Sequence, residues 1–190
     1  MKLLRWIYPS LVGMLLGLLQ IALFFQLAFT LSSSVRTFLM ITVCWLVGSV
    51  TGIRVARHLL WPLNSFVVLA ILAYFACVLL LGIAPFDTEL WPIYAGFIVL
   101  IGLFPGVFFV RLGDYYSAQV LFFRENNGFI IGLVSGTIFF LLFGRSALWT
   151  MPMLMAGVVI LCTTAFFQPL PHPKGDNDDP FFKPLMEIKP

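Results

Sequence analysis

Six stretches of this sequence stay apolar over a length close to the thickness of a lipid bilayer. A helix needs about 20 such residues to cross the hydrocarbon core, where backbone groups find partners only inside a helix or a closed barrel. The composition agrees, because 61% of the residues are hydrophobic and only 10% are charged. We therefore predict an all-α, polytopic membrane protein with six transmembrane helices, at residues 6–31, 37–53, 65–84, 93–110, 128–143 and 147–167.

The chain divides into two predicted parts, a six-helix domain at residues 1–167 and a tail at residues 168–190. The tail contains six prolines and three aspartates. Proline removes a backbone donor and breaks a helix, and so polar a segment buries little apolar surface. We expect the tail to be extended or disordered.

The basic residues are unevenly distributed between the two sides of the predicted spans. If the N-terminus is cytoplasmic, only Arg36 and Arg145 lie outside, whereas the other nine lie inside: Lys2, Arg5, Arg54, Arg57, Arg111, Arg124, Lys174, Lys183 and Lys189. Cytoplasmic loops retain Lys and Arg. We therefore expect an integral protein of a bacterial inner (plasma) membrane, with both termini in the cytoplasm.

The connection between the fourth and fifth predicted spans has mixed polarity. Residues 112–123 combine aromatic and aliphatic residues with polar ones, which is typical of a short interfacial helix. The next four residues, 124–127, fit a helix cap in front of the fifth span. The alternative is a cytoplasmic gate, in which Arg124 and Glu125 pair with Asp114 or Arg111.

Glycines four residues apart recur in four of the predicted spans. They share one helix face at this spacing and allow another backbone to approach closely, which favours helix packing in lipid. Tight packing and a sliding transporter interface are both consistent with them. The residues are Gly13, Gly17, Gly48, Gly52, Gly102, Gly106, Gly128, Gly132 and Gly136.

Two of these glycine segments resemble one another. The run Gly48-Ser49-Val50-Thr51-Gly52 is similar to Gly132-Leu133-Val134-Ser135-Gly136. Repeats of three helices have an odd number of crossings, so the second trio would be inverted relative to the first. Many secondary transporters use this 3+3 symmetry.

Charged residues are missing from the middle of every predicted span, although proton or ion pathways normally need one. The remaining polar candidates are Gln20 and Gln26, whose spacing places them on different helix faces. They either make interhelical hydrogen bonds or line a polar path. Pro105 beside Gly106 is a candidate hinge, with a static bend as the alternative.

No catalytic, metal or cofactor site is expected. His58 and His172 lack ligand companions at useful spacing, and the cysteines, Cys44, Cys77 and Cys162, lie in apolar runs without a CxxC motif. No nucleophile triad or phosphate loop is apparent, and the charge pattern does not indicate nucleic acid. We expect a protein that is not an enzyme.

Three segments resemble the membrane part of proteins in which a major-facilitator-like domain is fused to a spermidine synthase-like domain. They are residues 48–57, 103–109 and 122–132. Phe122 and Glu125 stand where the family pattern has Tyr and Asn, and no synthase domain follows. The resemblance covers about half of the chain and implies half of a major-facilitator-like bundle.

Two functional hypotheses follow from these features. In the first, the bundle pairs with itself or with another membrane subunit to form a transporter-like or scaffolding unit in the lipid bilayer. In the second, the chain is an accessory subunit or membrane anchor that holds a cytoplasmic partner through its tail and basic loops.

Overall fold

The computed structural model describes residues 2–59 and 61–166, and it confirms the all-α prediction. Six long helices are present, each long and apolar enough to cross a membrane. No strand occurs in the described residues, and the predicted tail lies outside them. The elements are α1 (Lys2–Thr30), α2 (Val35–His58), α3 (Leu63–Ile83), the 3-10 helix η1 (Thr88–Leu90), α4 (Trp91–Leu112), α5 (Ala118–Phe143) and α6 (Arg145–Phe166).

The start of α5 differs from the sequence prediction. A separate interfacial helix at residues 112–123 is wrong, because α4 continues to Leu112 and α5 already begins at Ala118. The hydroxyl of Ser117 accepts a hydrogen bond from the Val120 amide at 3.4 Å and caps the helix. No Gly or Pro occurs in the ten residues 118–127, so the helix runs through residues 124–127, which therefore do not cap it.

The end of α2 is also longer than predicted. The helix continues through Arg54 and Arg57 to His58, which the sequence placed in a basic loop. Positive side chains are favourable in the last turn of a helix, where the dipole is negative. Loss of apolar character therefore marks the membrane boundary here without ending the helix.

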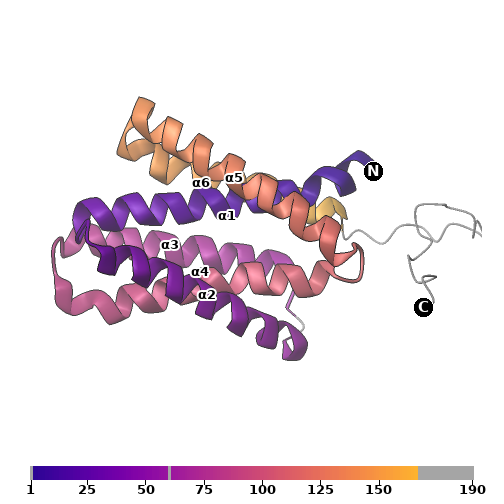
Figure 1. Ribbon diagram of the computed structural model, residues 1–190, viewed down its shortest axis with the longest axis horizontal. Coiled ribbons are helices and arrows are strands. Elements are labelled where there is room, and N and C mark those ends of the chain that lie inside the picture. The colour runs from indigo at the N-terminus through magenta and orange to yellow at the C-terminus, as the bar shows by residue number, and fades with distance from the viewer. Residues whose placement is uncertain (1, 60, 167–190) are drawn as a thin grey trace, which may run out of the picture.

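Consecutive helices along the chain run in opposite directions across the bundle (Figure 1). α1 is central and contacts α2, α3, α5 and α6, while α4 packs on α2 and α3. We call the end where α1, α3 and α5 begin the N-terminal end, and the opposite end the far end. At the far end, the Phe86 amide donates a hydrogen bond to the Thr30 carbonyl at 2.9 Å, which ties the α3–η1 link to the end of α1.

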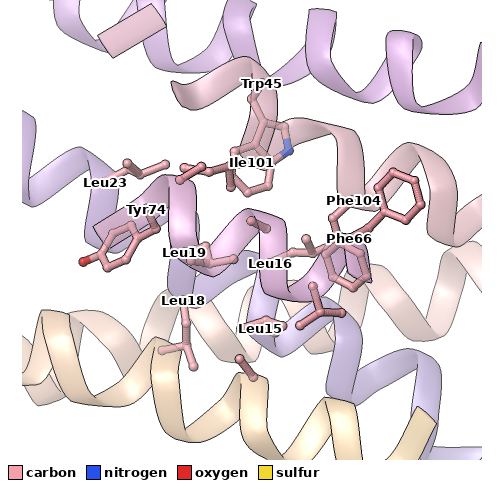
Figure 2. Packing of buried hydrophobic residues seen from close by; sticks show 14 of the residues in the cluster. Leu15, Leu16, Leu18, Leu19, Leu23, Trp45, Phe66, Tyr74, Ile101 and Phe104 are labelled. Carbon is pink, nitrogen blue, oxygen red and sulfur yellow. The ribbon is translucent and has the colours of Figure 1, made fainter. Parts of the chain in front are cut away.

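The core lies between α1, α3, α4 and α6. Figure 2 shows leucines of α1 among aromatic side chains from α2, α3 and α4. Leu15, Leu19, Tyr74 and Phe104 are fully buried. Since lipid is as apolar as this core, close packing rather than exclusion of water holds the helices together.

Two helix pairs approach each other so closely that only glycine fits. A Cβ added at Gly13 or Gly17 of α1 would collide with backbone of α5, and one added at Gly102 or Gly106 of α4 would collide with backbone of α2. We call these contacts the α1/α5 seam and the α2/α4 seam. Gly48, Gly52, Gly128 and Gly132 meet backbone of the partner helix in the same two seams, whereas a Cβ at Gly136 would meet only the side chains of Ile21 and Leu18.

α2 and α5 are the peripheral helices of the bundle. Only 22% and 17% of their most apolar 18-residue windows are buried, compared with 39–61% for the other four spans. Each presents its glycine face to the bundle and its opposite face to the surroundings. The surface offered by α2 and α5 is therefore wide and apolar.

Candidate functional site: two polar clusters at opposite ends of the bundle

Buried polar side chains occur at both ends of the bundle rather than halfway along it. At the far end they are Gln26 and Thr30 of α1, and at the N-terminal end Glu125 of α5 and Thr163 of α6. Thr37, the remaining buried polar residue among those described, donates to the nearby Ser32 carbonyl at 2.6 Å. Polar groups that could bind a solute or an ion are therefore found at the two ends of the described bundle.

The far cluster consists of Gln26, Thr30, Tyr74 and Arg145. The Arg145 Nη2 group donates to Gln26 Oε1 at 3.0 Å and to Thr30 Oγ1 at 3.2 Å. Tyr74 lies close to the Gln26 side chain, and its hydroxyl donates to the Leu148 carbonyl at 2.7 Å. The cluster thus links α1, α3 and α6 through one cation and neutral groups.

Two buried polar groups at the far end make no hydrogen bond to a described residue. Gln26 is 1% exposed, yet its Nε2 group has no hydrogen-bond partner among the described residues, and neither does the hydroxyl of the fully buried Tyr94 on α4. Buried donors without partners are costly. The arrangement can bind water or the acceptor oxygens of a solute. Asp87, just before η1, lies close enough to Tyr94 to interact with it electrostatically.

Gln20 does not belong to this cluster. It is half-buried, whereas Gln26 one and a half turns further along α1 is buried. Their spacing of six residues places them on different faces of α1. A joint polar lining by both residues is not assembled in this structure.

Glu125 is the one acidic side chain that the described structure buries. It is 8% exposed and occupies the α5 face that continues through Gly128 and Gly132, with its own carbonyl against Gly13. Counting about 20 residues back from the last residue of α5, Phe143, places Glu125 at the membrane boundary. The sequence placed this residue ahead of the span, whereas the helix carries it into the α1/α5 seam.

The four residues proposed as a cytoplasmic gate lie at the N-terminal end, but their side chains do not meet as ion pairs. Arg111 donates to the Leu59 carbonyl at 2.7 Å, and Arg124 donates to the Trp6 carbonyl at 3.1 Å and lies 4.9 Å from the Trp6 ring centre. Asp114 is exposed in the α4–α5 turn. Arg111 therefore links the end of α4 to the residue that follows α2, and Arg124 links the first part of α5 to α1.

A group of aromatic side chains lies at the N-terminal end, around Tyr8 and Phe166. The Tyr8 and Thr163 hydroxyls are 2.8 Å apart, and the Tyr8 ring stacks on Phe166 at 5.2 Å. Tyr115 of the α4–α5 turn contacts the same Phe166 ring at 5.5 Å. These contacts join α1, α6 and the turn at the point where the described chain ends.

The candidate hinge is enclosed by other helices. Pro105 and Gly106 are buried, and α4 is helical without a break from Trp91 to Leu112. A Cβ at Gly106 would collide with the Ser49 carbonyl of α2. Gly106 thus lies in the α2/α4 seam, and the role of Pro105 and Gly106 as a hinge stays a prediction.

Arg145 is the site residue that sequence reasoning overlooked. One available signal was its rarity, since it is one of two basic residues expected on the outer side. A second was its place after Gly144, whose φ of 65° turns the chain sharply into α6. Its acceptors, 115 and 119 residues earlier in the chain, could not be deduced from the sequence.

No group of three His, Cys, Asp or Glu side chains suited to a metal ion occurs among the described residues. The three cysteines are free. Comparisons of the chain with protein-family models, with curated proteins and with solved structures found no match.

Proposed function

We propose that this chain is one half of a transporter-like membrane assembly. In this proposal, α1–α3 and α4–α6 form two units of opposite orientation, and a second copy of the bundle completes the assembly. Its major-facilitator-like character rests on the sequence resemblance described above. The observation that supports it best is the agreement between the two glycine seams.

Four backbone contacts of one seam have counterparts in the other. In each case a Cβ added to glycine would meet the carbonyl oxygen of the named partner. The counterparts are Gly13–Glu125 and Gly102–Trp45, Gly17–Phe129 and Gly106–Ser49, Gly128–Ser10 and Gly48–Val99, and Gly132–Met14 and Gly52–Leu103.

This correspondence equates α1 with α4 and α5 with α2. Contacts move along both helices together in each seam, so the helices within a pair are parallel. The two pairs run in opposite directions (Figure 1). An inverted repeat has this relation. Its register pairs Gly48 and Gly52 with Gly128 and Gly132, one turn away from the match chosen by sequence.

The peripheral position of α5 supports pairing with a second bundle. Transporters with inverted repeats hold their solutes at the interface between repeats or bundles. Of the six described spans, α5 has the smallest buried share, 17% of its most apolar window. A partner bundle on the outer face of α5 would form a path between the two halves.

The distribution of arginines supports a cytoplasmic N-terminal end. Arg54, Arg57, Arg111 and Arg124 lie at this end of the described bundle, while Arg36 and Arg145 lie at the far end. Positive residues concentrate on the cytoplasmic side. In the proposal, the far cluster therefore faces the outside and Glu125 lies near the cytoplasm.

The test is the oligomeric state of the full chain in mild detergent, measured by crosslinking and by mass. We expect a dimer, which Ile131→Trp on the outer face of α5 weakens and Leu161→Trp on the outer face of α6 leaves intact. Both native side chains are exposed. A monomer at all protein concentrations would contradict the pairing.

Deleting residues 168–190 separates this proposal from the membrane-anchor hypothesis. The paired bundle should persist without the tail, because its proposed interface lies on α5. Loss of a co-purifying protein on deletion, with a monomeric bundle left behind, would instead favour the anchor.

A further inference from the structure

The outer face of α2 has a distinct pattern of exposed residues. Its middle part is apolar, with Leu39, Val43, Leu46, Val47 and Val50 all at least half exposed. At 3.6 residues per turn, these side chains share a sector of about 100° on the side opposite the glycines. Arg36 precedes this stripe, and Arg54 and Arg57 follow it in the same sector.

The length of the stripe matches a membrane. Arg36 and Arg54 are separated by 18 residues, or about 27 Å at 1.5 Å per residue, close to the roughly 30 Å of a hydrocarbon core. The apolar side chains between them therefore contact acyl chains. Arg54 and Arg57 extend from the same face at the level of the headgroups of one leaflet.

Arg54 and Arg57 differ from the other arginines at the N-terminal end. Arg111 and Arg124 donate to backbone carbonyls, whereas no hydrogen bond or ion pair joins Arg54 or Arg57 to a described residue. Both are exposed and lie three residues apart, so their guanidinium groups share one face. Trp61, 56% exposed, follows at the same end.

The helix dipole explains the position of Arg57 but not that of Arg54. Arg57 and His58 lie in the last turn of α2, where positive charge is favourable. Arg54 lies a turn earlier and points outward with the apolar stripe. Two positive charges without a described counter-ion therefore stand where lipid headgroups meet the helix.

We propose that Arg54 and Arg57 bind the headgroup of an anionic phospholipid whose acyl chains lie along the exposed stripe of α2. Guanidinium groups match phosphate oxygens in geometry and charge. A zwitterionic lipid offers the same phosphate but adds a positive group that the two arginines repel. The site thus prefers lipids with net negative charge.

The experiment is native mass spectrometry of the full chain with phosphatidylglycerol and phosphatidylcholine competing in mixed micelles. Each basic residue near an anionic surface contributes roughly fivefold to binding. The double variant R54Q/R57Q should therefore lose the phosphatidylglycerol preference by roughly thirtyfold. R36Q is the matched control, because it removes one arginine from the same face at the other end of the stripe.

The proposal is overturned if R54Q/R57Q keeps the preference or if R36Q loses as much. Salt provides a second readout that does not depend on folding of the variant. Raising ionic strength to about 1 M shortens the screening length to about 3 Å and should abolish the preference of the native chain. A preference that survives high salt would equally contradict an arginine-based site.

Discussion

The two glycine seams share a backbone arrangement but differ in one side chain. Where the α1/α5 seam has Glu125, the α2/α4 seam has Trp45, and each is 8% exposed. The indole of Trp45 lies in the apolar core with Ile101 (Figure 2). The carboxylate of Glu125 lies at the membrane boundary instead. The glycines thus allow the close approach of the helices in both seams. The residue three positions before Gly128 or Gly48 is acidic in one seam and aromatic in the other.

The largest expected effect comes from closing either seam. Gly13→Leu and Gly102→Leu each place a side chain against backbone that cannot move without shifting a helix. We expect each to cost about 3 kcal/mol of unfolding free energy or more, at the upper end of overpacking effects. Denaturant titration in mixed micelles measures this difference.

Gly96→Leu and Gly157→Leu are the matched controls, because a Cβ there meets nothing within 4 Å. Their unfolding free energies should change by less than about 1 kcal/mol. Equal losses at seam and control positions would show that helix approach is not what these glycines provide.

The next effect distinguishes Trp45 from Glu125. Trp45→Ala removes a large buried ring from the α2/α4 seam and should cost about 3–5 kcal/mol. Glu125→Leu removes a buried carboxylate without a described ion-pair partner and should stabilise the chain by about 1 kcal/mol. The same titration measures both, and a strong loss with Glu125→Leu would reveal a stabilising role for the carboxylate.

A smaller effect is expected at the far cluster. Arg145 is exposed at the helix end, so its hydrogen bonds to Gln26 and Thr30 are partly screened by solvent. A double-mutant cycle with Arg145→Met and Gln26→Leu should give a coupling energy of about 1 kcal/mol. A coupling of zero would mean that the contact does not persist in the membrane.

The sequence predicted the helices well because their apolar length reflects the solvent that surrounds them. It predicted their ends poorly, since α2 and α5 continue at the headgroup level, where polar residues are tolerated. The glycine spacing identified the packing faces. It could not reveal which helices pair, because Gly13 meets residues more than a hundred positions away.

The candidate site was only partly predictable for the same reason. Gln26 was identified because an amide in an apolar run is conspicuous. Arg145 and Tyr74 were not, because their positions beside Gln26 depend on how α3 and α6 pack on α1. Glu125 was noticed as a charge, but its burial depended on extending α5 by ten residues beyond the apolar run.

The inverted correspondence of the seams is the central claim, and distances between spin labels test it most directly. Asn126 corresponds to Leu46, since these residues follow Glu125 and Trp45, and Ser10 corresponds to Val99. Electron paramagnetic resonance on chains labelled at Ser10 and Asn126, or at Val99 and Leu46, should give matching distance distributions in lipid nanodiscs. Clearly different distributions would contradict the repeat and the assembly proposed from it.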